Sequence, residues 1–232
     1  MKRFYAQAAW VAAGSSYAVQ LDGRAIKTPA RNPLQLPTEK LADAIAREWA
    51  AQAEDIDPTT MPLTALAQGA LDQVAQERSR IISRIAAFAD SDMLYYRGDE
   101  NQAALVAHQA EKWDPLLDWA RARYDISFQL TYGIMHQSQA PQTIARLTEA
   151  VEAQDDFTIA AMLSLVGLAG SLVAILGLVE QVFDVETLWP VMNLEELWQE
   201  EQWGRDDLAV ETRARKQAEF AAAVHFLTLA RS

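Results

Sequence analysis

The chain has no cysteine among its 232 residues, and this absence excludes several classes of protein. Without thiols there is no disulfide scaffold, no thiolate metal site and no cysteine nucleophile. Basic residues are also scarce, because 20 Lys and Arg stand against 32 Asp and Glu, for a net charge of −12. Phosphate backbones and anionic membrane surfaces repel such a chain, so we expect no nucleic-acid partner.

Signatures of catalysis are missing as well. The three histidines, His108, His136 and His225, lie far apart, and none has a second ligand at metal-binding spacing. No phosphate-binding glycine loop or nucleophile elbow is present. His136 closes an apolar run that begins at Tyr132, and we expect it to be satisfied and partly buried. We predict no metal and no cofactor. The alternative is a small-molecule enzyme that uses carboxylates and His136.

One long hydrophobic run stands out. Residues 157–179 carry no charge over 23 positions, which is long enough for a membrane span. Asp156 and Glu180 flank this run without a nearby Lys or Arg, unlike the usual membrane anchor. Its small residues favour a buried helix, or two short helices broken near Gly167–Gly170. We therefore predict a buried segment and no membrane insertion, with a membrane-anchored component as the alternative.

The N-terminal region has the pattern of a small antiparallel sheet. Asp22-Gly23 is a strong hairpin signal, because glycine accepts the positive φ of a tight turn. Prolines then punctuate the chain up to Pro37. The expected strands are Phe4–Val11, Tyr17–Leu21, Ala25–Thr28 and Leu34–Leu36.

From Pro37 onward the hydrophobic period becomes helical. Thr38 is a good N-cap, and Ile45 and Trp49 follow on one apolar face, so we predict that Trp49 is a core residue. Trp49→Ala should then cost roughly 3–5 kcal/mol. The fold class is α+β, with a β-containing domain at 1–62 and a helical domain at 63–232. Further helices are expected at 63–89, 101–123, 141–153, 157–179, 187–201 and 206–230.

The most informative segment for function runs from Glu180 to Asp207. It holds nine acidic residues and one basic residue, together with Trp189, Trp198 and Trp203. Tryptophan is enriched at binding hot spots, and flanking carboxylates add orientation and selectivity. The alternative is that these tryptophans fill the protein's own core while the acidic residues are solvated. Trp113, by contrast, forms an apolar stripe with Leu116 and is read as core.

Short motifs spread along the chain resemble those of the ATP synthase F-one assembly factor two family. Each motif alone is weak, but together they occur in family order over nearly the whole chain. The motifs are Lys2-Arg3-Phe4-Tyr5, Leu21-Asp22-Gly23-Arg24, Lys27-Thr28-Pro29, Pro33-Leu34, Leu36-Pro37-Thr38, Glu48-Trp49, Ile56-Asp57-Pro58, Met61-Pro62-Leu63-Thr64, Trp113-Asp114-Pro115-Leu116, Gly133-Ile134-Met135-His136 and Gln199 with Glu201-Gln202-Trp203-Gly204.

The resemblance implies a chaperone rather than an enzyme. Family members hold the unassembled α subunit of ATP synthase until β subunits displace them, and they use no cofactor. The same resemblance implies a β-containing N-terminal domain and a helical C-terminal domain. We expect a monomer. No secretory signal precedes the first motif, so the expected location is the bacterial cytoplasm, or the mitochondrial matrix for organellar members.

The partner site is expected in the acidic segment rich in tryptophan. Arg205 stands where the family usually carries an acidic residue, so the acidic character rests on its neighbours. The predicted partner-binding residues are Glu200, Glu201, Trp203, Asp206 and Asp207.

Overall fold

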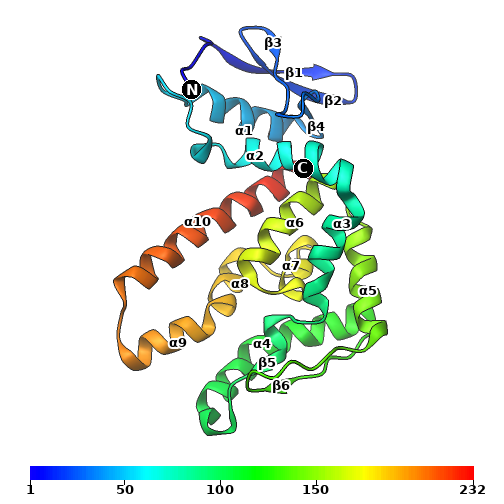
Figure 1. The fold of residues 1–232 in the computed structure, drawn as a ribbon, viewed down its shortest axis with the longest axis vertical. Helices are drawn as coiled ribbons and strands as arrows, with labels where there is room; N and C mark the ends of the chain where they lie inside the picture. The colour runs from blue at the N-terminus through cyan, green and yellow to red at the C-terminus, as the bar shows by residue number, and fades with distance from the viewer. The chain divides into compact units, whose positions relative to one another are not determined.

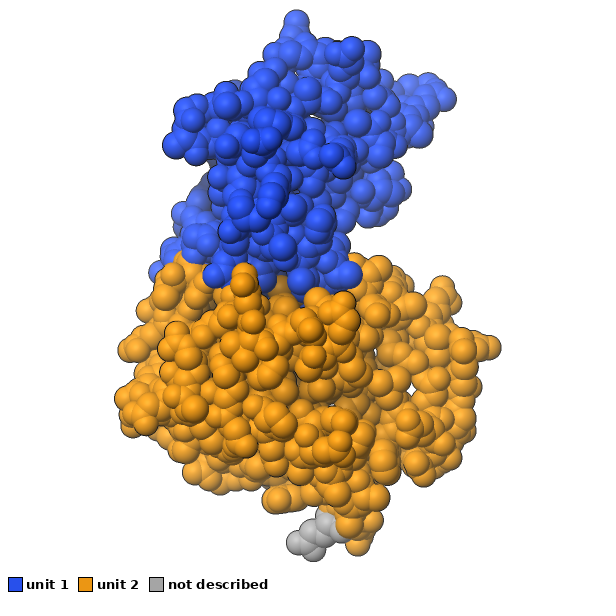
Figure 2. Space-filling view, turned by 180° about the vertical axis from the view of Figure 1, so that it is seen from behind, with its two compact units in different colours: residues 1–81, 155–164, 219–232 blue, residues 82–154, 165–218 orange. Residues whose placement is uncertain are grey.

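The chain forms two compact units in the computed structural model, which describes residues 1–99 and 101–232 in full and Glu100 by its backbone alone. One unit consists of residues 1–81, 155–164 and 219–232, and the other of residues 82–154 and 165–218 (Figure 2). We call them unit 1 and unit 2. Compact units do not decide where independently folding domains begin, so the division between residues 62 and 63 stays a prediction.

Unit 1 contains the small antiparallel sheet that the sequence predicts (Figure 1). Its strands are shorter than or shifted from the expected ranges. The pairing places β2 next to each of the other three strands. The strands are β1 (Ala8–Ala13), β2 (Ser16–Leu21), β3 (Arg24–Ala25) and β4 (Gln35–Leu36).

The turn between β2 and β3 is set by two residues. Asp22 and Gly23 have φ values of 48° and 78°, the positive values that a two-residue hairpin turn requires at both positions. The Asp22 carboxylate also accepts the backbone N–H groups of Ala6 at 3.1 Å and Gln7 at 2.8 Å. The N–H groups just before β1 are therefore satisfied by a side chain, while the Gln7 carbonyl still accepts the Asp22 N–H at 3.0 Å. The predicted hairpin is confirmed.

Helix α1 (Glu39–Ala50) packs on this sheet. Its N-cap is Thr38, as the sequence predicts, and the Thr38 hydroxyl accepts the Leu41 N–H at 3.2 Å. The same hydroxyl donates to the Leu229 carbonyl at 2.6 Å. Leu229 belongs to the last turn of α10 (Asp207–Ala230), so the end of the chain is part of unit 1.

Glu48 explains why two of the sequence motifs occur together. Its carboxylate accepts the backbone N–H groups of Leu63 and Thr64, both at 2.8 Å, and the Thr64 hydroxyl at 2.7 Å. These N–H groups belong to the first turn of α2 (Pro62–Gly69), where helical donors have no intrahelical partner. One side chain of α1 therefore caps the next helix, and this cap is buried enough to raise the Glu48 pKa.

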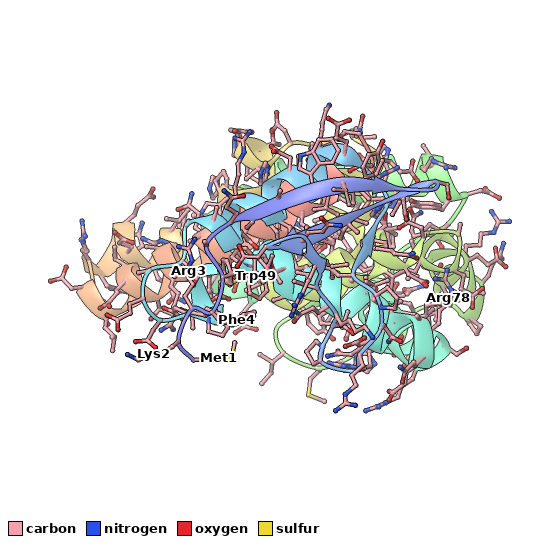
Figure 3. All side chains as sticks on the ribbon, turned by 90° about the horizontal axis from the view of Figure 1, so that it is seen from above. Met1, Lys2, Arg3, Phe4, Trp49 and Arg78 are labelled. Atoms are coloured by element: carbon pink, nitrogen blue, oxygen red, sulfur yellow. The ribbon has the colours of Figure 1, made fainter. Side chains whose placement is uncertain are left out.

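The prediction that Trp49 is a core residue overstates its burial. Trp49 is half-buried against a cluster of Tyr5, Leu21, Ile56 and Met61, with its ring 5.8 Å from that of Tyr5. It borders a cavity of about 530 Å³ together with Phe4. Figure 3 labels both residues. Its indole N–H is buried and makes no hydrogen bond to any described residue.

We therefore expect Trp49→Ala to lower the free energy of unfolding by about 2 kcal/mol, below the cost of a fully buried tryptophan. Part of the ring already contacts solvent, and its unpaired N–H contributes no bond. Urea denaturation of the wild type and of the variant measures this difference. A decrease in the free energy of unfolding of more than about 4 kcal/mol would show that Trp49 is a core residue. No decrease would show that it is a surface residue.

The helix expected at 63–89 is interrupted. α2 continues into a π-helical turn at Ala70–Val74 and then into α3 (Ala75–Ala86), which is kinked at Glu77 with φ −121° and ψ 31°. A short 3-10 turn at Ala87–Ala89 follows. The hydrophobic period crosses these breaks without a proline or a cluster of turn residues, so the sequence does not reveal them.

Unit 2 is mainly helical, as predicted. Trp113 of α4 is buried, and its indole N–H donates to the Val191 carbonyl at 2.9 Å, so its reading as core is confirmed. Pro115 lies inside α4 without ending it. The elements with residues in this unit include α4 (Ala103–Tyr124), α5 (Pro141–Glu152), α7 (Leu172–Val179), α8 (Val185–Met192), α9 (Leu194–Trp203) and a short parallel pair, β5 (Tyr96–Arg97) with β6 (Thr131–Tyr132).

The uncharged run 157–179 folds as two buried helices, α6 (Asp156–Ala169) and α7. The break falls at Gly170, where φ is +68°, and Ser171 caps α7 by accepting the Ala174 N–H at 3.0 Å. The alternative with two helices is therefore the correct one. In the part of the chain that the structure describes, every helix is too short or too polar to cross a membrane.

Candidate functional site

The corner between α9 and α10 carries the predicted partner site. α9 ends at Gly204, whose φ of 92° and ψ of 170° suit glycine and almost no other residue. α10 starts at once, because the Asp206 carboxylate accepts the Leu208 N–H at 2.9 Å. The Trp-Gly pair and the acidic residues that follow thus encode a tight reversal between two helices.

Glu200 belongs to the support of this corner. Arg213 of α10 is nearly buried and reaches back to two carboxylates of α9, Glu196 at 2.9 Å and Glu200 at 2.5 Å. The hydrogen bond to Glu200 is the main cause of the raised Arg213 pKa. This forked ion pair ties α9 to α10 and holds the Glu200 carboxylate against Arg213.

The outer face of the corner is apolar at its centre and acidic around it. Trp203 is 77% exposed and Leu208 is 71% exposed. Glu201, Asp206 and Asp207 are exposed beside them, and Asp207 has an ion pair with Arg205 at 3.3 Å. Large apolar side chains held at such exposure on a fixed corner are typical of an interaction surface. We call Glu201, Trp203, Asp206, Asp207 and Leu208 the corner surface.

A groove adjoins the corner surface at Glu201. It has a volume of about 390 Å³. Inside it the Trp198 ring packs against the His108 ring, with centroids 5.7 Å apart. Its lining comes from α4, α8 and α9: His108, Lys112, Thr187, Pro190, Val191, Leu194, Leu197, Trp198 and Glu201. Trp189 and Trp198 are half-buried and pack against the protein itself, whereas Trp203 faces solvent.

The residues named for an enzyme alternative form no comparable site. His136 is exposed, which corrects the expectation of partial burial, although it is satisfied: its Nδ1 lies 2.9 Å from the Tyr96 hydroxyl and its Nε2 lies 3.2 Å from the Asp90 carboxylate. Tyr96 borders a cavity of about 380 Å³ whose lining does not include His136. Among the described residues, no three His, Asp or Glu side chains are close enough to hold a metal ion.

Comparison with known proteins identifies the family. The family model described as ATP12 chaperone protein matches residues 2–121, just over half of the 232 residues. The chain belongs to the ATP12 chaperone family. The resemblance inferred from the sequence motifs, to the chaperones of ATP synthase assembly, is therefore confirmed.

Individual members of the ATP12 family match over most of the chain. The Schizosaccharomyces pombe protein named atp12, mitochondrial, is 26% identical over 216 residues, which span 88% of this chain and 74% of the relative. The crystal structure of Atp12 from Paracoccus denitrificans superimposes with a TM-score of 0.93 at 37% identity and covers 99% of this chain and 98% of that one. A point mutant of the same Atp12p gives the same values.

The corner surface contains four of the five residues that the sequence suggested for a partner site, together with Leu208, which the sequence did not single out. Its apolar type suggests a buried helix position, and only the exposed first turn of α10 shows otherwise. The exposed residues Ile134 and Met135 were missed for the same reason, because an apolar run without charges is usually core. The partner role of the predicted residues is taken up as a proposal below.

Proposed function

We propose that this ATP12-family chaperone binds the unassembled α subunit of ATP synthase and covers the surface that will later contact β subunits. The observation that carries the proposal is Trp203, which is 77% exposed at a corner that Gly204 fixes. The protein acts as a monomer and by binding alone, without catalysis or a cofactor. A subunit surface destined for an interface is apolar before assembly and aggregates if it is left uncovered.

The chemistry of the corner surface suits that task. Trp203 and Leu208 supply the apolar contact, because exposed tryptophans anchor interfaces when they are buried by a partner. Glu201, Asp206 and Asp207 supply negative charge, which attracts a basic surface and raises the rate of encounter. Glu200 supports the corner surface indirectly, because its ion pair with Arg213 fixes the position of α9. A small apolar centre gives moderate affinity, which allows a β subunit to displace the chaperone.

Displacement is the property that separates an assembly chaperone from a permanent partner. Purified α subunit is mixed with this protein, and the complex is isolated by size-exclusion chromatography. Addition of β subunit should transfer the α subunit into an α/β complex and release the chaperone as a monomer. A complex that never forms, or one that β subunits do not disrupt, would contradict the proposal.

Reversal of one exposed charge tests the site itself. We expect Glu201→Lys to fold normally, because exposed substitutions usually change stability by at most about 0.5 kcal/mol. Its affinity for the α subunit should fall by about tenfold or more, since a like charge then faces the basic partner surface. Titration calorimetry with purified α subunit measures this change.

The matched control is Glu219→Lys, which makes the same charge change at an exposed position in the middle of α10. This control should bind like the wild type, so that net charge alone cannot explain a loss. If the Glu201 and Glu219 variants bind equally well, Glu201 lies outside the site.

The cellular location follows from the same proposal. ATP synthase assembly takes place where its catalytic subunits are made or imported. We therefore place the chain in the cytoplasm if it is bacterial, and in the mitochondrial matrix if it is organellar, as the name of the fission yeast relative indicates for that protein. Fractionation of the native host with an antibody to this protein tests the location.

A further inference from the structure

A second apolar surface lies in the loop between β6 and α5. Ile134 is 95% exposed and Met135 is 77% exposed, and the neighbouring Tyr132 is exposed as well. We call residues 132–136 the apolar tip. None of the partner-binding residues predicted from the sequence lies in this loop, and its residues belong to unit 2, as does the corner surface.

The base of the loop is closed by hydrogen bonds. The Gln139 side chain accepts the Gln129 N–H at 2.8 Å and donates to the Gln129 carbonyl at 2.9 Å. The Asp90 carboxylate accepts the Gln139 N–H at 2.7 Å. Residues 129 and 139 are therefore held together, and the nine residues between them are anchored at both ends.

The tip itself is also fixed. β6 pairs with β5, and the Gly133 N–H donates to the Arg97 carbonyl at 2.9 Å. Gly133 has a φ of +81°, and a Cβ there would lie 2.7 Å from the Asp99 carboxylate, so glycine is needed at this position. His136 contacts both Tyr96 and Asp90. Every polar contact turns toward the protein, while the two aliphatic side chains point to solvent.

The composition of the segment around the apolar tip indicates which kind of surface it can contact. Between Asp125 and Arg146 there is no Asp, Glu, Lys or Arg, although 22% of the whole chain is charged. An exposed, uncharged and rigid apolar loop loses little entropy on binding and offers no charge to select a charged partner. It fits an apolar, uncharged patch on another protein. A second copy of this chain is a poor occupant, because each copy carries a net charge of −12.

We infer that the apolar tip is a second contact for the client subunit, in which Ile134 and Met135 dock on an apolar patch that is exposed before assembly. This inference rests on the proposed function, since it names a further contact with the same α subunit. Two side chains are too few for a stable interface of about 800 Å² per partner. The tip therefore adds to the corner surface, and two linked contacts bind more tightly than either alone.

The test uses the full chain and purified α subunit. The double variant Ile134→Ser with Met135→Ser should keep the wild-type melting temperature, because both side chains are exposed. Its affinity for the α subunit should fall by about 100-fold, since two apolar anchors are removed. The control is Val182→Ser, which removes another exposed aliphatic side chain, one in the turn after α7, and should bind like the wild type.

Each outcome decides a separate point. A double variant that binds as tightly as the wild type overturns the tip contact and leaves the proposed function standing. Failure of the wild type to bind the α subunit overturns both. Sedimentation velocity of the chaperone alone adds a third outcome: a wild-type dimer that the double variant converts to monomer would assign the tip to a second copy. A photoreactive residue placed at position 135 should crosslink to the α subunit and not to another copy.

Discussion

Leu165→Lys should abolish the fold. Leu165 has no exposed surface, and every residue of the following helix α7 is buried. An ammonium group at this position loses its hydration, and burial of an unpaired charge costs several kcal/mol even after relaxation. The free energy of unfolding of small proteins is only about 5–15 kcal/mol. The combined cost of lost packing and lost hydration should exceed it, so the protein should unfold.

Circular dichroism and the yield of monomer after expression measure this effect. The matched control is Leu168→Lys, one turn further along α6, where the side chain is half-buried at the edge of a cavity and a lysine can reach water. The control should lose much less stability. A folded Leu165→Lys monomer with a wild-type melting curve would mean that the uncharged run is not a packed interior.

Asp92→Ala should be the second most damaging change. Asp92 is fully buried, and its carboxylate accepts the Leu94 N–H, the Val173 N–H and the Ser171 hydroxyl, each at 3.0 Å. These donors lie at the start of α7 and in the turn that begins at Met93. Alanine leaves all three donors without an acceptor in the interior. We therefore expect the free energy of unfolding, measured by urea denaturation, to fall by about 4 kcal/mol.

The same carboxyl group makes stability depend on pH. Burial raises the pKa of Asp92 from 3.8 to about 6, against the opposing effect of its hydrogen bonds. Between these values the folded state holds a proton that the unfolded state has released, so the contribution of Asp92 to stability falls as pH rises from about 4 to 6. Between these pH values, the contribution of Asp92 to the free energy of unfolding should fall by about 3 kcal/mol. Asp92→Asn removes this titration. The free energy of unfolding of the wild type should therefore fall relative to that of Asp92→Asn as pH rises from about 4 to 6. If the two proteins show the same dependence on pH, the pKa of Asp92 is not raised.

Local signals in the sequence were sufficient for the sheet and for most helix positions. Asp22-Gly23 specifies its turn through backbone conformation alone, and Thr38 specifies a helix start through one hydroxyl. Neither depends on distant parts of the chain. The motifs that indicated the family are likewise short and ordered, and the fold class α+β is confirmed.

What the sequence left open depends on contacts between distant residues. Glu200 and Glu201 are neighbours of the same type, but their side chains point about 100° apart on a helix. Only the position of Arg213 shows that Glu200 turns inward and leaves Glu201 to face solvent. The apolar type of Ile134 and Met135 does not indicate their exposure, which depends on the hydrogen bonds that hold the loop. The parallel pair of β5 and β6 is too short to leave a pattern.

The most direct test of the proposed function is the solubility of the α subunit in cells. The α subunit is expressed without a β subunit, either alone or together with this chain, and its distribution between supernatant and pellet is measured after lysis. The proposal predicts that the α subunit is mostly in the pellet when expressed alone and mostly in the supernatant in the presence of the chaperone. An α subunit whose distribution is the same in both cases would contradict it.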